Sequence, residues 1–320
     1  MKLRDLFKEI IEVGKNYDPR GKEGVKRELD NRKKAYDKMS EKEKRYYDAD
    51  KLDNPYSDSK IYNGKGDEEI KTIAIGVDME TPELLLIDRM KEKGMKIDAV
   101  MTHHPEGTAL LSLNEVMYMQ ADVIHKFGVP INVADGVLKG RINDVAKGLL
   151  PINYDRAVKA AKLLDIPYFG AHTPCDNCVA TYLQDKFNDK KPYTVGEVIN
   201  LLMEEEEYKM SFADNNGPRV VVGSKTSRAG KVFVDMTGGT EGSSDMLAKL
   251  ADSGVGTIVG MHMSKDHLKK AEANHINVVI AGHMASDAVG MNILLDSVEN
   301  KLGKLEIIEL SGFNRIRRVK

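Results

Sequence analysis

The sequence predicts an α/β protein made of two similar lobes with mainly parallel sheets, preceded by a helical N-terminal extension. Short apolar runs alternate with longer amphipathic segments, which is typical of parallel strands joined by helices. In addition, Val77-Asp78-Met79 recurs as Val234-Asp235-Met236, in each case directly after an apolar run. This repetition favours a duplicated α/β lobe, and two such lobes would face a shared cleft.

The predicted extension comprises residues 1–66, which are rich in lysine and glutamate. Its first apolar residues have helical spacing at Leu3, Leu6, Phe7, Ile10 and Ile11. Further along, Ser40 and Glu43 have the spacing of a capping box, and Asn54-Pro55 ends the helical pattern. We interpret the charged face of this extension as a solvated surface, and an arm that binds a partner is the alternative.

A strand–helix–strand unit follows the extension. Residues 72–77 are predicted to form a buried strand, Thr81-Pro82 to begin a helix that ends near Gly94, and residues 97–102 to form a second strand. In parallel sheets, ligands bind beyond the carboxyl ends of the strands. Asp78 and the adjacent pair His103-His104 both lie at that edge.

Three clusters of polar residues follow predicted strands. They are residues 102–105 (THHP) after strand 97–102, residues 171–176 (AHTPCD) after strand 166–170, and residues 282–287 (GHMASD) after strand 276–281. Imidazole and carboxylate groups are ligands that zinc, iron and manganese accept. Pro105 favours an abrupt exit from the strand, so that His103 and His104 can both turn toward one point. His283 and Asp287 are four residues apart, and they share one face if a helix begins there.

Other polar segments have simpler explanations. A single histidine near a strand end is usually structural, which is our interpretation of His125, His267 and His275. Segment 217–226 lacks the glycine spacing of a phosphate-binding loop. Segment 238–244 is either a flexible turn or a set of backbone N–H groups that holds an anion.

Composition restricts the class of partner. The chain has 320 residues, a formal net charge of -2, 41% hydrophobic and 31% charged residues, so it lacks the positive field that attracts nucleic acid or an anionic membrane. No apolar run is long enough to span a bilayer. Cys175 and Cys178 have CxxC spacing but no second pair, and are expected to be free thiols in a reducing compartment. These features predict a cytoplasmic protein.

Four segments, in this order, resemble the NGG-interacting factor three-like (NIF3-like) family, also known as the GTP cyclohydrolase type 2 family. They are residues 76–105 (GVDMETPELLLIDRMKEKGMKIDAVMTHHP), 169–176 (FGAHTPCD), 234–245 (VDMTGGTEGSSD) and 278–287 (VVIAGHMASD). The resemblance covers about residues 60–320. It implies two interlinked α/β lobes, a dinuclear metal centre in the cleft between them, and a ring-like homohexamer.

The resemblance also implies a ligand set. The implied metal ligands are His103, His104, Asp176, His283 and Asp287, and His172 would line the pocket. Family members usually have glutamate where this chain has Asp287, which is one methylene shorter. Occupancy of the second metal position is therefore open, and His262 is the first substitute if Asp287 is not a ligand.

These observations together predict a metal-dependent hydrolase with two divalent transition-metal ions, which are zinc, iron or manganese, and with His172 as the catalytic proton carrier. By resemblance, the small-molecule substrate is GTP or a related nucleotide, whose five-membered purine ring would be opened by water. The alternative is a non-catalytic, metal-binding oligomeric scaffold or regulatory protein. The predicted first lobe spans residues 67–190, joined by 284–320, and the predicted second lobe spans residues 191–283.

Overall fold

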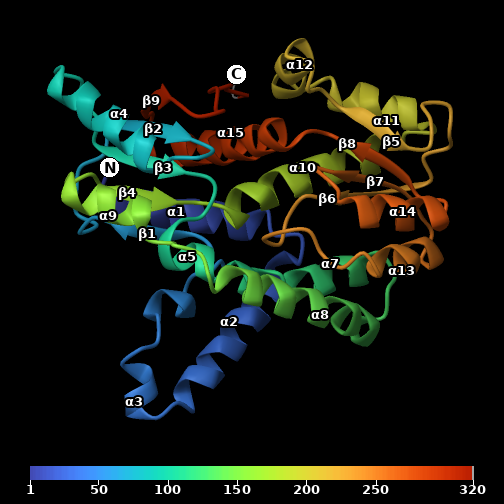
Figure 1. Ribbon diagram of the computed structural model, residues 1–320, viewed down its shortest axis with the longest axis horizontal. Coiled ribbons are helices and arrows are strands. Elements are labelled where there is room, and N and C mark those ends of the chain that lie inside the picture. The colour runs from blue at the N-terminus through green and yellow to red at the C-terminus, as the bar shows by residue number, and fades with distance from the viewer. Residues whose placement is uncertain (319–320) are drawn as a thin grey trace.

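Two separate β-sheets underlie the computed structural model, which describes residues 1–318 (Figure 1). The first sheet contains, in spatial order, β1 (Lys60–Asn63), β4 (Tyr168–Gly170), β3 (Ala99–Thr102), β2 (Thr72–Gly76) and β9 (Glu306–Glu309). The second contains β5 (Arg219–Val222), β8 (Asn277–Ile280), β7 (Val255–Gly260) and β6 (Lys231–Asp235).

The two sheets repeat one topology. β1-β4-β3-β2 in the first sheet corresponds to β5-β8-β7-β6 in the second. In both, the first strand along the chain pairs antiparallel with the fourth, and the remaining pairs are parallel. β9 then adds a further parallel strand beside β2. The prediction of two similar α/β lobes with mainly parallel sheets is therefore confirmed.

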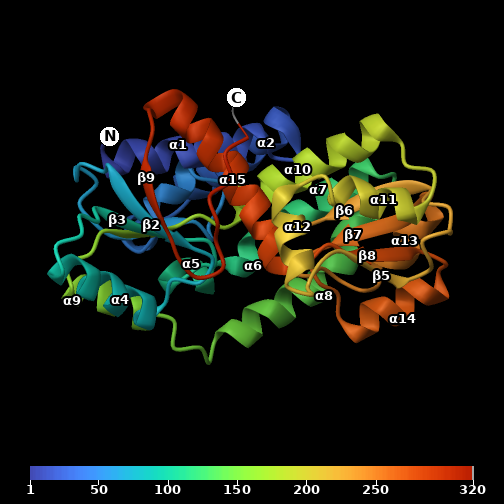
Figure 2. The same cartoon turned by 90° about the horizontal axis from the view of Figure 1, so that it is seen from above.

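Helices α10 (Thr173–Lys190), α15 (His283–Leu302) and α1 (Leu3–Asn16) pack against one another (Figure 2). Their apolar side chains belong to one buried cluster, which also includes residues from both sheets. Leu3 and Ile10 of α1 are completely buried in it. The amphipathic spacing of the first residues thus produces a core helix.

The outer faces of the sheets are covered by further helices. α4 (Thr81–Glu92) and α9 (Arg156–Leu163) pack on the first sheet. α7 (Met119–Lys126), α8 (Ile131–Leu149), α13 (Met246–Asp252) and α14 (Lys265–Ala273) pack on the second. The short helices α5 (Gly107–Leu111) and α6 (Leu113–Val116) precede α7, while α11 (Val195–Leu202) and α12 (Glu206–Ala213) precede β5.

Beyond α1, the N-terminal segment contains α2 (Gly21–Asp37), α3 (Glu41–Lys44) and the 3-10 helix η1 (Ala49–Leu52). α2 and α3 project from the body of the molecule (Figure 1). The predicted capping box is present, since Ser40 Oγ accepts from the Glu43 N–H and the Glu43 carboxylate accepts from the Ser40 N–H. The lobe boundaries proposed from the sequence remain a prediction. No helix within residues 1–318 is long and apolar enough to cross a membrane.

Candidate metal centre

The carboxyl ends of the strands bring the three predicted polar clusters together. His103 and His104 directly follow β3, and His172 follows β4 as the residue before α10. Asp176 lies in the first turn of α10. His283 is the first residue of α15, and Asp287 lies one turn further along the same face. The helix predicted to begin near residue 284 is confirmed.

Three of the histidines are held by a hydrogen bond at Nδ1. His103 Nδ1 donates to the backbone oxygen of Ala171 at 3.2 Å. The Nδ1 of His104 lies 2.6 Å from Asp78 Oδ1, and the Nδ1 of His172 lies 2.8 Å from Asp58 Oδ2. Each bond fixes the ring so that Nε2 faces the cluster, which is the usual arrangement behind metal-binding histidines.

The Nε2 atoms converge on two buried carboxylates. His103 Nε2 lies 3.4 Å from Asp176 Oδ1 and 3.5 Å from Asp287 Oδ1. The other oxygen of Asp287 lies 3.6 Å from His104 Nε2 and 3.7 Å from His283 Nε2. The two oxygens of Asp287 therefore face different histidines.

The buried polar atoms of this cluster lack hydrogen-bond partners. Among residues 1–318, neither His103 Nε2, Asp176 Oδ1 nor either oxygen of Asp287 has one. A buried carboxylate without a partner is strongly destabilising. Divalent cations accept imidazole nitrogens and carboxylate oxygens as ligands, so the residues present fit a metal site.

Ligand-type atoms form overlapping groups within 4.8 Å of one another. One group contains His103, Asp176 and Asp287, and a second contains His104, His283 and Asp287. The two groups share Asp287. A third group contains His103, His104 and His172. The clusters can therefore hold metal.

The electrostatics of the cluster favour positive charge. Burial lowers the pKa of His103, but the neighbouring carboxylates of Asp287 and Asp176 outweigh this effect and raise it well above its usual value. Burial raises the pKa of Asp287, but the surrounding histidines lower it overall. The pKa of His283 is lowered, mainly by burial. The carboxylates that stabilise an imidazolium would equally stabilise a bound cation.

Two functional neighbours have roles that the sequence did not reveal. Asp78 was placed at the sheet edge, but its contact with His104 was not predicted. Asp58 is completely buried and accepts hydrogen bonds from His172 and Thr173. It lies in the irregular segment before β1, 114 residues away from His172 in the chain. No strand or helix pattern precedes Asp58, so sequence periodicity gives no signal for it.

The other candidates occupy distinct positions. His262 lies beside His283, with ring centroids 5.0 Å apart, but it belongs to none of the ligand groups. His125 makes a local hydrogen bond, in which its Nδ1 donates to the backbone oxygen of Val129 at 2.8 Å. Cys175 and Cys178 are buried free thiols, as predicted.

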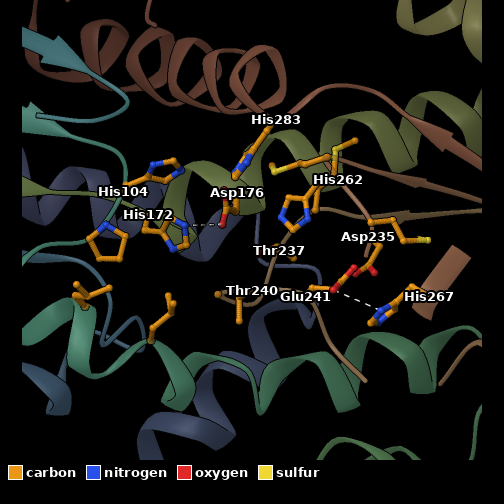
Figure 3. Close-up of a pocket in the computed structure, with 17 residues that line it drawn as sticks. His104, His172, Asp176, Asp235, Thr237, Thr240, Glu241, His262, His267 and His283 are labelled. Atoms are coloured by element: carbon orange, nitrogen blue, oxygen red, sulfur yellow. Dashed lines mark ion pairs between the residues drawn. The ribbon is translucent and has the colours of Figure 1, made fainter. Parts of the chain in front are cut away.

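A cavity of about 280 Å³ adjoins the cluster and reaches the edge of the second sheet (Figure 3). His104, His172, Asp176 and His283 lie on one side of it. Asp235, Glu241, His262 and His267 line the part that belongs to the second lobe. The cavity therefore gives a small molecule access to the candidate ligands.

Comparison with models of known protein families finds no match, and comparison with curated proteins finds none. Among solved structures, the chain is similar to a NIF3 superfamily protein from Sphaerobacter thermophilus, with 25% identity and a TM-score of 0.69, over 80% of this chain and 91% of that chain. It is also similar to reduced HcgD from Methanocaldococcus jannaschii (18% identity, TM-score 0.48, 78% and 86% of the chains). A third structure is the protein ybgI, of unknown function (14% identity, TM-score 0.45, 80% and 92% of the chains).

The fold and the buried cluster define a two-lobed α/β protein whose sheet edges surround a candidate metal centre. The similarity to the Sphaerobacter structure extends over most of both chains and agrees with the motifs in the sequence. The resemblance to the NIF3-like family seen in the sequence is therefore supported by the structure of a NIF3 superfamily protein.

Proposed function

We propose that the protein is a metal-dependent hydrolase with a dinuclear centre. The ligands in this proposal are His103, His104, Asp176, His283 and Asp287. The observation that carries it is the position of Asp287, whose two oxygens face separate histidine groups at 3.5 Å and at 3.6 to 3.7 Å. In this proposal Asp287 would supply one ligand oxygen to each of two ions, although it is shorter than the glutamate usual in the family.

The protein's own residues supply positioning and proton transfer. A bound pair of divalent ions would supply Lewis-acid chemistry that polarises a carbonyl or phosphoryl group of the substrate. His172 is the proposed proton carrier, because Asp58 occupies its Nδ1 and leaves Nε2 toward the cavity, 3.7 Å from Asp176 Oδ2.

The substrate suggested by the family resemblance is GTP or a related nucleotide. None of the described residues that line the cavity is a lysine or an arginine. A triphosphate would therefore have to be held by the metal ions or outside the cavity, because no fixed cation is present to bind it. We accordingly propose a nucleotide-sized molecule whose reacting group, and not its phosphates, enters the cavity and faces the proposed ligands.

The test is elemental analysis of protein purified without a chelator, followed by a nucleotide-hydrolysis screen of the same sample. Asp287→Asn should deplete one of two metal positions, since it removes charge and an oxygen ligand. Asp287→Glu should retain both. Asp185→Asn, at an exposed position of α10, is the control that should leave metal content unchanged. Two fully occupied positions in Asp287→Asn would contradict the bridging role.

A non-catalytic scaffold is the second candidate, because α2 and α3 project from the body and present a charged surface (Figure 1). Metal binding without turnover of any nucleotide would favour it. In either case we propose a homohexamer, on the family resemblance. Light scattering at working concentration tests the assembly, and a monomer would contradict it.

A further inference from the structure

The second-lobe wall of the cavity carries a carboxylate without a partner. Asp235 is the last residue of β6 and lines the cavity opposite the candidate ligands (Figure 3). None of the described residues donates a hydrogen bond to its side chain, and the neighbouring charge of Glu241 has the same sign. A carboxylate in this position is available to a ligand.

The equivalent carboxylate of the first lobe is paired. Asp78, in the repeated tripeptide, contacts His104 at 2.6 Å. β2 pairs Gly76 with Thr102, and β6 pairs Phe233 with Ile258. Two residues beyond these pairs, Asp78 lies opposite His104 in the first lobe. In the second lobe, Asp235 lies opposite Gly260. The second lobe thus has the aspartate at the equivalent position but lacks the imidazole that contacts it in the first lobe.

Glu241, the other carboxylate of this wall, is already engaged. Its Oε1 accepts the backbone N–H of Ser264 at 2.7 Å, and its Oε2 lies 3.4 Å from His267 Nδ1. The ring of His267 also donates from Nε2 to the Gly242 oxygen at 3.2 Å. His267 therefore has structural contacts, and of the two carboxylates of this wall Asp235 is the one without a partner among the described residues.

The loop that forms the wall is fixed in place. Gln120 Nε2 donates to the backbone oxygens of Gly238 at 2.8 Å and Thr240 at 2.7 Å. Arg141 Nε donates to the backbone oxygen of Glu241 at 3.0 Å. Segment 238–244 is therefore held by side chains from α7 and α8. The carboxylates of Asp235 and Glu241 beside this segment disfavour the anion-binding role that was one of its two interpretations from sequence.

We propose that Asp235 anchors a substrate-recognition subsite for a planar group with two adjacent N–H donors, such as an amidinium or a 2-amino nitrogen heterocycle. A carboxylate accepts two parallel N–H donors in this geometry, and the absence of lysine and arginine from the described lining removes competing cations. The inference rests on the proposed function, because the subsite faces the candidate metal ligands across one cavity. It names the class of group that the substrate presents to the second lobe.

The experiment is titration calorimetry of benzamidine into the full-length, metal-containing protein, with benzoate as the matched anion. Benzamidine should bind, and benzoate should not bind at the same concentrations. Asp235→Asn and Asp235→Ala should each weaken benzamidine binding at least about tenfold, in line with the loss of a charge-assisted bidentate contact. Asp252→Asn, an exposed aspartate on α13, should bind as the unmodified protein does.

Metal content measured on the same samples separates this inference from the proposed function. If the protein carries metal but benzamidine does not bind, or binds equally to both Asp235 variants, the subsite is disproved and the metal centre stands. If benzamidine binds through Asp235 to protein that carries no metal after supplementation, the subsite stands and the proposed function fails.

Discussion

Individual side chains outside the ligand set determine how the histidines are oriented. Asp58 accepts from His172 Nδ1 at 2.8 Å and from Thr173 Oγ1 at 2.6 Å, and it has no exposed surface. An anionic acceptor at Nδ1 selects the tautomer that leaves Nε2 without a proton, and it increases the basicity of that nitrogen. Asp58 is thus a positioning residue for the proposed proton carrier.

Replacing Asp58 with asparagine should impair His172 without removing metal. The amide still accepts a hydrogen bond but carries no charge, so we expect hydrolysis to fall by about 10- to 100-fold. Nitrogen-15 NMR of His172 should show a shift in the tautomer population, and metal content should remain unchanged. Ser57→Ala is the control, because Ser57 bonds to Glu115 and not to His172. An unchanged His172 spectrum would contradict the role of Asp58.

The sequence predicted the proposed metal ligands, but it did not predict the residues that hydrogen-bond to them or to His172. His103, His104 and His283 follow apolar strands, and strand ends can be recognised from sequence. Asp58 reaches His172 because β1 pairs antiparallel with β4, and this pairing joins residues more than a hundred positions apart. Such a contact depends on tertiary structure, so no local pattern encodes it.

At the level of elements, the N-terminus of α15 positions two proposed ligands. The helix begins at His283 directly after Gly282, whose φ of 106° lies in a region that only glycine adopts readily. This conformation turns the chain sharply from β8 into the helix. The direction of the first helical turn, and therefore of His283, depends on this glycine.

Gly282→Ala should reduce both stability and metal occupancy. A side chain at this φ costs about 1–3 kcal/mol of unfolding free energy, and relief of that strain would move His283. Gly303→Ala is the matched control, because Gly303 ends the same helix with a φ of 97° and has open space around it. Urea unfolding should show a loss in both variants, whereas elemental analysis should show depletion only in Gly282→Ala. Equal metal content would contradict this expectation.

Helix α1 shows where composition was a poor guide. The lysine- and glutamate-rich segment 1–66 predicted an extension, yet α1 packs against α10 and α15, which carry Asp176 and Asp287. Charge on one face of a helix does not reveal whether the opposite face packs on the surface or in the centre of the protein. The spacing of the apolar residues predicted the helix, and only the tertiary structure shows its place.

Leu6→Ala should therefore destabilise the whole protein. Leu6 is 1% exposed, and truncation of such a leucine typically costs about 2–5 kcal/mol. Tyr46→Ala, on the projecting segment, is the control, because Tyr46 is 86% exposed and its loss should change stability by no more than about 0.5 kcal/mol. Urea unfolding measures both. A Leu6 variant as stable as the Tyr46 variant would show that α1 is peripheral.

At the scale of the whole molecule, the Asp235 carboxylate lowers stability. Burial, with a smaller effect from Glu241, raises the pKa of Asp235 to about 7. The unfolded chain has a pKa of about 3.9 at this residue, so between these values the folded state binds the additional proton. The free energy of unfolding should therefore decrease as pH rises from about 4 to 7, by at most about 4 kcal/mol.

Asp235→Asn should remove this dependence. The variant should become progressively more stable than the unmodified protein as pH increases from about 4 to 7, and the difference should then remain constant. Urea unfolding between pH 4.5 and 8 measures it, with Asp252→Asn as a variant that should follow the unmodified protein. If the difference in the free energy of unfolding between the two proteins stays constant across this range, the pKa of Asp235 is not raised in the folded state.

Helices α7 and α8 precede β4 in the chain but cover the second sheet, and this arrangement has a consequence for limited proteolysis. A cut in the exposed segment 150–154 would place β4 on one fragment and the strands on either side of it in the sheet, β1 and β3, on the other. The same cut would place α7 and α8 on one fragment and the second sheet that they cover on the other. Neither fragment contains a complete hydrophobic core. We therefore expect the nicked protein to remain a single particle in gel filtration, and the separated fragments to regain structure only when mixed.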